Sequence, residues 1–434
     1  MSNATLTELA ARWADQVRKL DTPASPTWLE DLRHKATGHF SAGGFPHRKV
    51  EAWRYTPLKR LESAGPGLPG KIASTCPVTI DAALLPDVPA IDIVDGVLAQ
   101  GSAQLPDGVS VFTLAEAIEM FEGPVRALAE AVPVDGPARA FDAINTAFLH
   151  QGVVIRVEKG ADAGTLLLRF AGSARSADEF VPCRVMLLME AGARLELVEQ
   201  HLAEVTSPAA LHLLVQPHLA ENAELEHVRV QDEGEEAILL TTTRVQQDGA
   251  SCYRFRGFDL GGGLVRHELH VSLEGEGALA DLAGAWVLDG RRHCDTRVAV
   301  EHVAPDCSSV QFFRGVLGGS SRGVFNGRAL IREGADGSSV RQSNANLLLS
   351  PLAEMDTKPE LEIYADEVEA SHGATVGQLD EGAIFYLRTR GLTEAQARRL
   401  LTAAFCHAVS QKLNNAALAE NLGERIGAAM PESV

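Results

Sequence analysis

From residue 150 onward, the sequence repeats one kind of turn at a nearly constant spacing. Short runs of Val, Ile, Leu and Thr alternate with turns that read KGADAG, EAGARL, AENAEL, QDGASC, EGEGAL, APDCSS and EGADGSS. Subtraction gives steps of 32, 30, 27, 28, 29 and 30 residues between the small residues Ala161, Ala193, Ala223, Ala250, Ala278, Cys307 and Gly337. A tight corner that stacks directly on its neighbour needs a small residue. The period and the strand-rich sequence therefore predict a β-solenoid, and leave open whether one unit is one coil or two.

The composition excludes several classes of partner. A chain of 434 residues with a net charge of −19 is a poor ligand for nucleic acid or for an anionic membrane surface. The sequence contains no apolar run long enough to span a membrane, and its first residues lack the apolar segment of a secretory signal. We therefore expect a cytoplasmic protein with no nucleic-acid or membrane partner.

The cysteines do not form a recognisable ligand set. No CxxC pair and no short Cys/His spacing occurs among Cys76, Cys183, Cys252, Cys294, Cys307 and Cys406. This scatter argues against a disulfide framework and against a zinc or cluster site within one chain. Reduced thiols in a cytosol are the simpler interpretation.

Helical signals flank the repeat on both sides. Residues 1–150 form a helical and mixed region, with capping-box patterns at Thr5 and Thr113 and a second helix predicted from Thr27 to His39. The first of these boxes precedes an apolar helix, and the second should open a helix that ends at Glu122. Within residues 48–61, the aromatic segment around Trp53 is expected to anchor these helices to the rest of the protein.

The repeat itself is assigned to residues 151–378, and residues 379–434 to a C-terminal helical subdomain. In that subdomain, three helices are expected to form a small bundle. The middle helix has an apolar stripe that should pack on the preceding helix, made of Ala397, Leu400, Leu401, Ala404, Phe405, Ala408 and Leu413.

Residues 356–379 join the repeat to the helices and carry the main candidate for chemistry. A partly alternating strand runs into an acidic turn, after which His372 lies between Ser371 and Gly373. On a turn, this imidazole could reach outward, and a carboxylate such as Glu369 could hold its tautomer or share a transition metal. The alternative is a solvated acidic turn with no ligand role.

Other motifs point away from catalysis. The chain has no phosphate-binding loop ending in Lys-Ser or Lys-Thr, no HExxH and no GxSxG, so it should not hydrolyse ATP by itself. His267 and His270 lie three residues apart on a predicted strand, where their side chains point to opposite faces and cannot share a metal. The triple glycine 261–263 is interpreted as a turn.

The segment DTKPELEIYADEVEASHGATVGQLDEGAIFYLRTRG resembles the C-terminal signature of the SufD family, which are scaffold subunits of the SUF iron–sulfur cluster assembly machinery. RKVEAWRYTPL, CDTRVAVEH and GVFNGRALI resemble other parts of that family, so the resemblance covers most of the chain. It implies a right-handed parallel β-helix between an N-terminal helical region and a C-terminal helical subdomain. It also implies a complex with the paralogous subunit SufB and two copies of the ATPase SufC.

The same resemblance assigns roles to particular residues. The functional histidine of the family falls on His372, as a ligand for iron or for a nascent cluster at the SufB–SufD interface, with Glu369 as a weaker second candidate. Many relatives carry a cysteine two residues before this histidine, where this chain has Ala370. The helices after residue 378 would bind SufC, and the candidate contacts are Phe385, Tyr386, Leu387, Arg390, Leu400 and Phe405.

The resemblance thus implies a scaffold that is not an enzyme, binds no cofactor stably by itself and holds iron or a cluster only transiently. Two alternatives remain open from the residues: a solenoid that only binds other proteins, and a carbohydrate-active β-helix enzyme with paired carboxylates. Only 5% of the residues are aromatic, which leaves few side chains to stack on sugars. The isolated chain could also form a homodimer.

Overall fold

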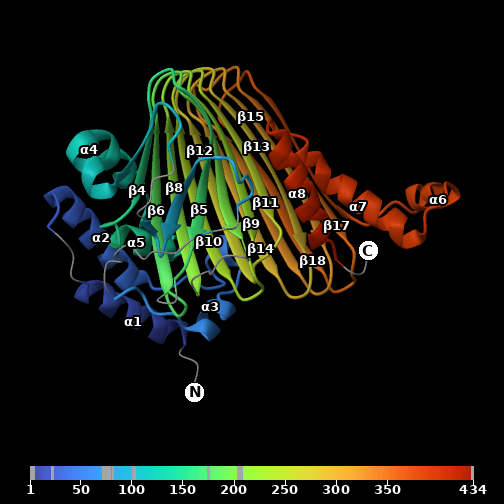
Figure 1. Ribbon diagram of the computed structural model, residues 1–434, viewed down its shortest axis with the longest axis horizontal. Coiled ribbons are helices and arrows are strands. Elements are labelled where there is room, and N and C mark those ends of the chain that lie inside the picture. Colours follow the sequence, from blue (N-terminus) through green and yellow to red (C-terminus); the bar gives the residue numbers. More distant parts are fainter. Residues whose placement is uncertain are drawn as a thin grey trace.

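The protein is a β-solenoid with helices at both ends, as the sequence predicts (Figure 1). The computed structural model describes residues 5–20, 24–70, 80, 83–99, 104–173, 176–202 and 209–431. Cys76 lies outside these residues, and the other five cysteines are buried free thiols. Among the described residues, no helix is long and apolar enough to cross a membrane.

Two sheets form the walls of the solenoid. The order of the nine-stranded sheet, from one end to the other, is β3 (Val109–Thr113), β4 (Val153–Val157), β6 (Phe180–Met189), β8 (Ala210–Leu219), β10 (Ile238–Gln247), β12 (Leu264–Leu273), β14 (His293–His302), β16 (Arg322–Ile331) and β18 (Glu354–Ile363). The order of the ten-stranded sheet is β2 (Val97–Leu98), β1 (Ala90–Val94), β5 (Asp162–Ala171), β7 (Arg194–Leu202), β9 (Glu224–Asp232), β11 (Cys252–Asp259), β13 (Leu279–Leu288), β15 (Ser308–Leu317), β17 (Ser339–Leu348) and β19 (Glu369–Gly377). Neighbours are parallel from β4 and β5 onward.

One sequence repeat is one coil, which settles the point that the spacing leaves open. A coil contains one strand of each sheet, and the strand of the next coil lies in register beside it. Leu264 of β12, for example, pairs with His293 of β14, which pairs with Arg322 of β16. Each coil therefore places its side chains directly over those of the coil before it.

The corner residues stack as predicted, but two of them are displaced by one position. The backbone N–H of Cys252 donates to the oxygen of Ala223, and that of Leu279 donates to Ser251 and not to Ala250. In the same way, Glu369 donates to Ser338 and not to Gly337. Ala250 and Gly337 both have positive φ, so they turn the chain one residue before the stacked position.

The lumen of the solenoid holds the main core. Residues that alternate along the strands point inward, and they include Leu197, Leu282 and Phe313, each no more than 1% exposed. Because parallel strands buried on both faces gain most of their stability from apolar burial, this column of side chains fixes the coils in register.

The N-terminal helices cover the outer face of the nine-stranded sheet (Figure 1). They are α1 (Leu6–Lys19), α2 (Thr27–Gly43), α3 (Lys59–Ala64), α4 (Leu114–Glu130) and α5 (Ala140–Ala147), with short 3₁₀ turns at Glu51–Trp53 and Pro137–Arg139. Both predicted capping boxes are present. Two predicted helix ends are wrong, because α2 continues through Gly38 to Gly43 and α4 continues past a break at Phe121.

Trp53 anchors this region to the sheet, as predicted. It is buried, its Nε1–H donates to the carbonyl oxygen of Ala138 at 3.1 Å, and the Arg266 guanidinium lies 3.8 Å from its ring centroid.

The C-terminal helices are α6 (Glu381–Thr389), α7 (Glu394–Ser410) and α8 (Ala416–Ala429). The predicted packing of α7 is wrong in one respect. Its buried face is formed by Thr402, Cys406 and Val409, whereas Leu400 of the predicted stripe is half exposed. This face packs with α8 against the outer face of the ten-stranded sheet, in one apolar cluster with Val228. The sheet therefore holds this face of α7 in place, while α7 also contacts the preceding helix α6, and Ala397 of the predicted stripe is buried.

Candidate functional site

His372 lies on strand β19, and not on the turn that the sequence predicts. Its Cα pairs in register with that of Gln342 in β17, whose side chain is buried in the lumen. Because register fixes the face of a strand residue, the imidazole lies on the lumen side of the last coil. Among the described residues no further strand follows β19 in its sheet, and the ring is exposed at the end of the solenoid.

Glu369 cannot support this imidazole in the way that the sequence suggests. It pairs with Ser339, three residues before His372 on the same strand, and so points to the opposite face. Within the described part of the chain, no side chain hydrogen-bonds to the His372 ring, and no group of three or more His, Cys, Asp or Glu could hold a metal ion. This end of the chain offers one imidazole and no complete ligand set.

The interior changes from apolar to polar as it approaches His372. Gln311, Gln342 and His372 occupy successive coils at the same register. The next inward position of β17 holds Asn344, whose Oδ1 accepts from Thr357 Oγ1 at 2.8 Å. Polar side chains therefore line the lumen just beneath the exposed end.

The candidate partner contacts lie on the C-terminal helices in three different settings. Phe385 and Tyr386 of α6 are 68% and 56% exposed, whereas Ile384, which directly precedes them on the helix, is buried. Arg390 is exposed and its Nη2–H donates to the Tyr386 hydroxyl at 3.2 Å. Leu400 is exposed on α7, while Leu387 and Phe405 are half-buried. Of these six, Phe405 is packed against the sheet cluster, whereas α6, which carries the exposed aromatic pair, projects away from the solenoid (Figure 1).

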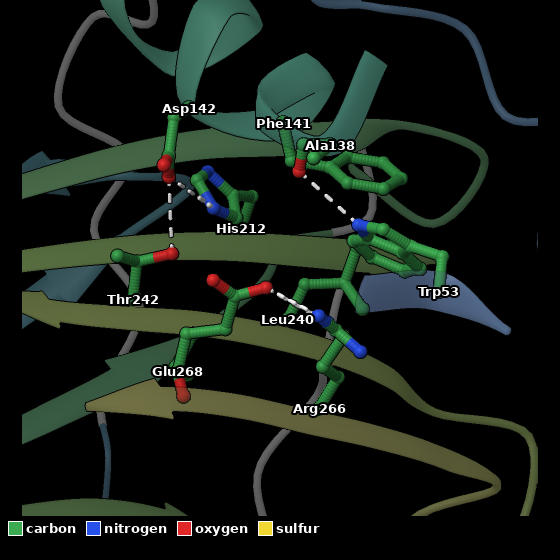
Figure 2. A pocket seen from close by; sticks show the side chains of 10 residues that line it. Trp53, Ala138, Phe141, Asp142, His212, Leu240, Thr242, Arg266 and Glu268 are labelled. Carbon is green, nitrogen blue, oxygen red and sulfur yellow. Dashed lines mark hydrogen bonds and ion pairs between the residues drawn. The ribbon is translucent and has the colours of Figure 1, made fainter. Parts of the chain in front are cut away.

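A buried ionic network, which the sequence analysis missed, joins the N-terminal region to the nine-stranded sheet (Figure 2). Asp142 of α5 accepts from Thr242 Oγ1 at 3.0 Å and from Arg244 Nη2 at 3.1 Å, and His212 Nε2 lies 3.8 Å away. Burial alone would raise the pKa of the Asp142 carboxyl, but the positive charge of Arg244 brings it below its ordinary value. Asp142 is therefore a buried, paired anion.

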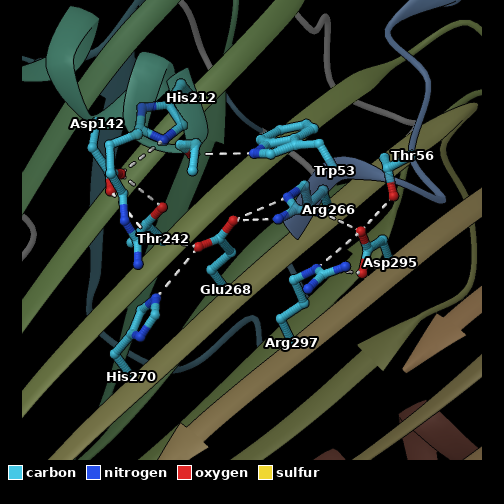
Figure 3. Close-up of polar contacts among 12 residues, drawn as sticks. Trp53, Thr56, Asp142, His212, Thr242, Arg266, Glu268, His270, Asp295 and Arg297 are labelled. Atoms are coloured by element: carbon cyan, nitrogen blue, oxygen red, sulfur yellow. Dashed lines mark hydrogen bonds and ion pairs between the residues drawn. The ribbon is translucent and has the colours of Figure 1, made fainter. Parts of the chain in front are cut away.

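Arg266 forms the second half of this network (Figure 3). Its guanidinium is 2% exposed and pairs with both Glu268 and Asp295, and Asp295 also accepts from the hydroxyl of Thr56. Every one of these charges has a partner on another strand or on the N-terminal segment. The arrangement therefore holds the N-terminal region on the solenoid.

A second polar cluster lies in the lumen. The carboxylate of Glu199 contacts His201 Nε2 at 2.8 Å and His227 Nε2 at 3.1 Å, and His227 Nδ1 contacts the Tyr253 hydroxyl at 3.0 Å. His267 also points inward, whereas His270 contacts Glu268 on the outer face. The prediction that these two histidines do not share a site is confirmed.

Buried neutral histidines make the fold sensitive to acid. Burial lowers the pKa of His212, His293 and His302 to about 4. Between pH 6.5 and 4 these histidines therefore bind more protons in the unfolded chain than in the folded one. Their contribution to the free energy of unfolding decreases as the pH falls. We expect a decrease of about 2 kcal/mol per histidine between pH 7 and pH 5, measured by urea unfolding.

His302→Gln is the matched variant for this prediction, because Gln can still bond Ser309 and Ser338, the partners of His302. It should reduce the pH dependence by about one histidine's share, roughly 2 kcal/mol. Wild-type stability that stays constant from pH 7 to pH 5 would contradict the assignment.

Two family models match the chain. The model described as SUF system FeS cluster assembly, SufBD core domain, matches residues 170–405, and the SufBD protein N-terminal region matches residues 6–166. The chain is 29% identical to the iron–sulfur cluster assembly protein SufD of Escherichia coli, over 89% of this chain and 90% of that protein. It is 27% identical to an iron–sulfur cluster assembly SufBD family protein of Synechocystis, over 90% of this chain and 88% of the relative.

A third relative, the chloroplastic protein ABCI7 of Arabidopsis thaliana, is 31% identical over 54% of this chain and 49% of its own length. The core model alone covers more than half of the chain, and it includes the last coil with His372 and helix α6. This chain therefore belongs to the SufBD family of the SUF system and has a role in the assembly of iron–sulfur clusters.

Proposed function

We propose that the chain is a non-enzymatic scaffold that pairs with a SufB-type subunit through its last coil, binds a SufC-type ATPase through α6, and lends His372 to a nascent cluster. The observation that carries this proposal is the open end of the solenoid. Strands β18 and β19 end their two sheets, and no described strand lies beyond either of them. Their outer edges present unpaired backbone groups, which natural proteins cover or pair.

Exposed apolar side chains at the open end of the solenoid also favour an interface there. Ile363 and Val376 continue the register of the inward positions of Ile331 and Asn346, yet they are 41% and 44% exposed. Tyr364, beside Ile363, is 65% exposed. A second β-helix of the same period could add a coil here and cover these side chains while pairing the edges. A SufB-type paralogue fits this geometry, and a second copy of this chain would fit it in the isolated protein.

His372 lies within that surface, on the lumen side of β19. A neutral imidazole is a good ligand for iron, and one ligand from this chain would complete a set whose thiolates come from the partner. The iron or cluster is the cargo of the interface and would be held only while the two subunits are together. Ala370, two residues before His372 and on the same face of the strand, supplies no ligand.

Pairing through the last coil predicts a specific loss. Val376→Lys places a charge on the covered side of β19, so we expect it to abolish co-purification with a SufB-type subunit. Met120→Lys is the control, because Met120 is 61% exposed on α4, near the other end of the solenoid (Figure 1). If the Val376 variant binds as well as the control, the proposed interface is wrong.

A further inference from the structure

A basic groove lies where the N-terminal segment meets the corners of the nine-stranded sheet. Its volume is about 670 Å³. Two of its lining side chains are carboxylates, Glu235 and Glu236, and six are permanent cations: Arg48, Lys59, Arg60, Arg291, Arg292 and Arg322. Subtracting two from six leaves an excess of four positive charges, on a protein whose net charge is −19. Such a local reversal of sign marks a surface for an anionic partner.

The walls of the groove are fixed by hydrogen bonds to backbone. Arg60 of α3 donates from Nη1 to the carbonyl oxygen of Glu235 and from Nη2 to that of Arg291, both at 3.1 Å. The triple-glycine turn makes room for this contact, because a Cβ on Gly263 would lie 2.6 Å from Arg60 Nη1. Arg292 Nη1 donates to the carbonyl oxygen of Leu260 at 3.1 Å. The solenoid therefore holds these two guanidinium groups in place.

Three of the remaining cations are available to a ligand. Arg48, Lys59 and Arg291 are exposed, and no carboxylate of the described residues lies within 4.0 Å of them. Arg322 shares its charge with Glu354, and Arg292 lies 3.7 Å from Glu235. The free charges thus lie on the α2–α3 segment on one side and on a coil corner on the other.

The cations occupy two neighbouring corners and the segment that faces them. Leu264, His293 and Arg322 are in register on β12, β14 and β16, so Arg291 and Arg292 lie on the corner before His293, and Arg322 lies on the next coil about 4.8 Å away. Cations spread over two coils and the facing α2–α3 segment suit the separated carboxylates of an extended chain better than one compact oxyanion. The lining contains no Phe, Tyr or Trp on which nucleic-acid bases could stack.

We propose that this groove binds an extended acidic peptide segment of a partner protein. None of the lining residues belongs to β18, β19 or α6, and only Arg322, through its pair with Glu354, contacts the last coil. The inference therefore does not depend on the proposed pairing with SufB- or SufC-type subunits. Such a peptide would contact the cations around the triple-glycine turn, whose small residues leave room for Arg60.

The test uses the full chain and a fluorescein-labelled hexaglutamate peptide at low ionic strength. Replacing Arg48, Lys59 and Arg291 together with Gln should weaken binding about tenfold, because three unpaired charges are lost. The charge-preserving triple variant Arg48→Lys, Lys59→Arg and Arg291→Lys should bind like the wild type. The matched control replaces Arg18, Lys35 and Arg341 with Gln. These three residues are exposed cations without a carboxylate partner among the described residues.

The proposal would be overturned if the affinity for the peptide fell equally in the groove variant and in the control. It would also be overturned if neither variant changed that affinity. Inorganic pyrophosphate and a ten-residue oligouridylate serve as competitors. If either binds more tightly than the peptide and loses affinity in the groove variant, the site is for a small oxyanion or for RNA, and the peptide assignment is wrong. Weak competition by both supports it.

Discussion

Replacing Phe385 and Tyr386 together with Ala is expected to abolish binding of a SufC-type ATPase and to leave the solenoid folded. Both side chains are more than half exposed, whereas Ile384 secures α6 to its neighbours. Exposed aromatic pairs of this kind act as anchors in interfaces and contribute about 2–4 kcal/mol each, so their joint loss should weaken binding at least a hundredfold. Co-purification and titration calorimetry with the purified ATPase would measure the change.

These point substitutions are a sharper test than removal of everything after residue 378. Helices α7 and α8 cover the outer face of the ten-stranded sheet, where Val409 and Leu422 pack in one cluster with Val228. Truncation would expose that face, so a loss of binding could simply report misfolding. Met120→Ala, which removes an exposed side chain on α4, is the control. Full binding by the Phe385/Tyr386 double variant would show that the ATPase docks elsewhere.

His372→Ala is expected to lower the yield of iron–sulfur cluster in the assembled complex several-fold without changing its subunit composition. The ring is exposed at the end of the lumen, so its removal creates no cavity and should cost little stability. Iron content and the visible absorbance of the reconstituted cluster are the measurements. Glu369→Ala is the matched control, since Glu369 lies on the same strand but on its opposite face.

The comparison also distinguishes two kinds of scaffold. If His372→Ala and the wild type yield equal cluster, His372 is a structural residue and the chain acts only through protein contacts. If both His372→Ala and Glu369→Ala lose cluster, the strand as a whole is required, and the ligand assignment to one imidazole is wrong. Loss in His372→Ala alone is the result that the geometry predicts.

The sequence predicts the solenoid well because one physical constraint recurs in every coil. A corner that stacks on its neighbour must be small, and the spacing of those corners reveals the period without any knowledge of the sheets. The two displaced corners at Ser251 and Ser338 show the limit of the pattern. At both corners the residue with positive φ (Ala250 or Gly337) and the stacked serine after it are small, so composition alone cannot tell them apart.

Local signals misplace His372 and the buried face of α7 for a related reason. Ser371, His372 and Gly373 have the composition of a turn, but hydrogen bonding to β17 holds them as a strand. For α7, several faces of the helix carry apolar side chains, and contact with the sheet decides which of them is buried. Tertiary contacts set both outcomes.

The buried ionic network escaped prediction because its residues alternate like the solvent-facing side of a strand. Arg266, Glu268 and His270 would be exposed if the nine-stranded sheet faced water. The pairing of residues one repeat apart would have indicated the network. Asp295 and Arg297 fall opposite Arg266 and Glu268 one coil later, which places opposite charges side by side across neighbouring strands.

Native mass spectrometry of the full chain, mixed with purified SufB-type and SufC-type subunits, tests most directly whether this chain is a scaffold within a cluster-assembly complex. We predict one assembly that contains one copy of this chain, one SufB-type subunit and two SufC-type subunits. A folded chain that associates with neither subunit would contradict the account.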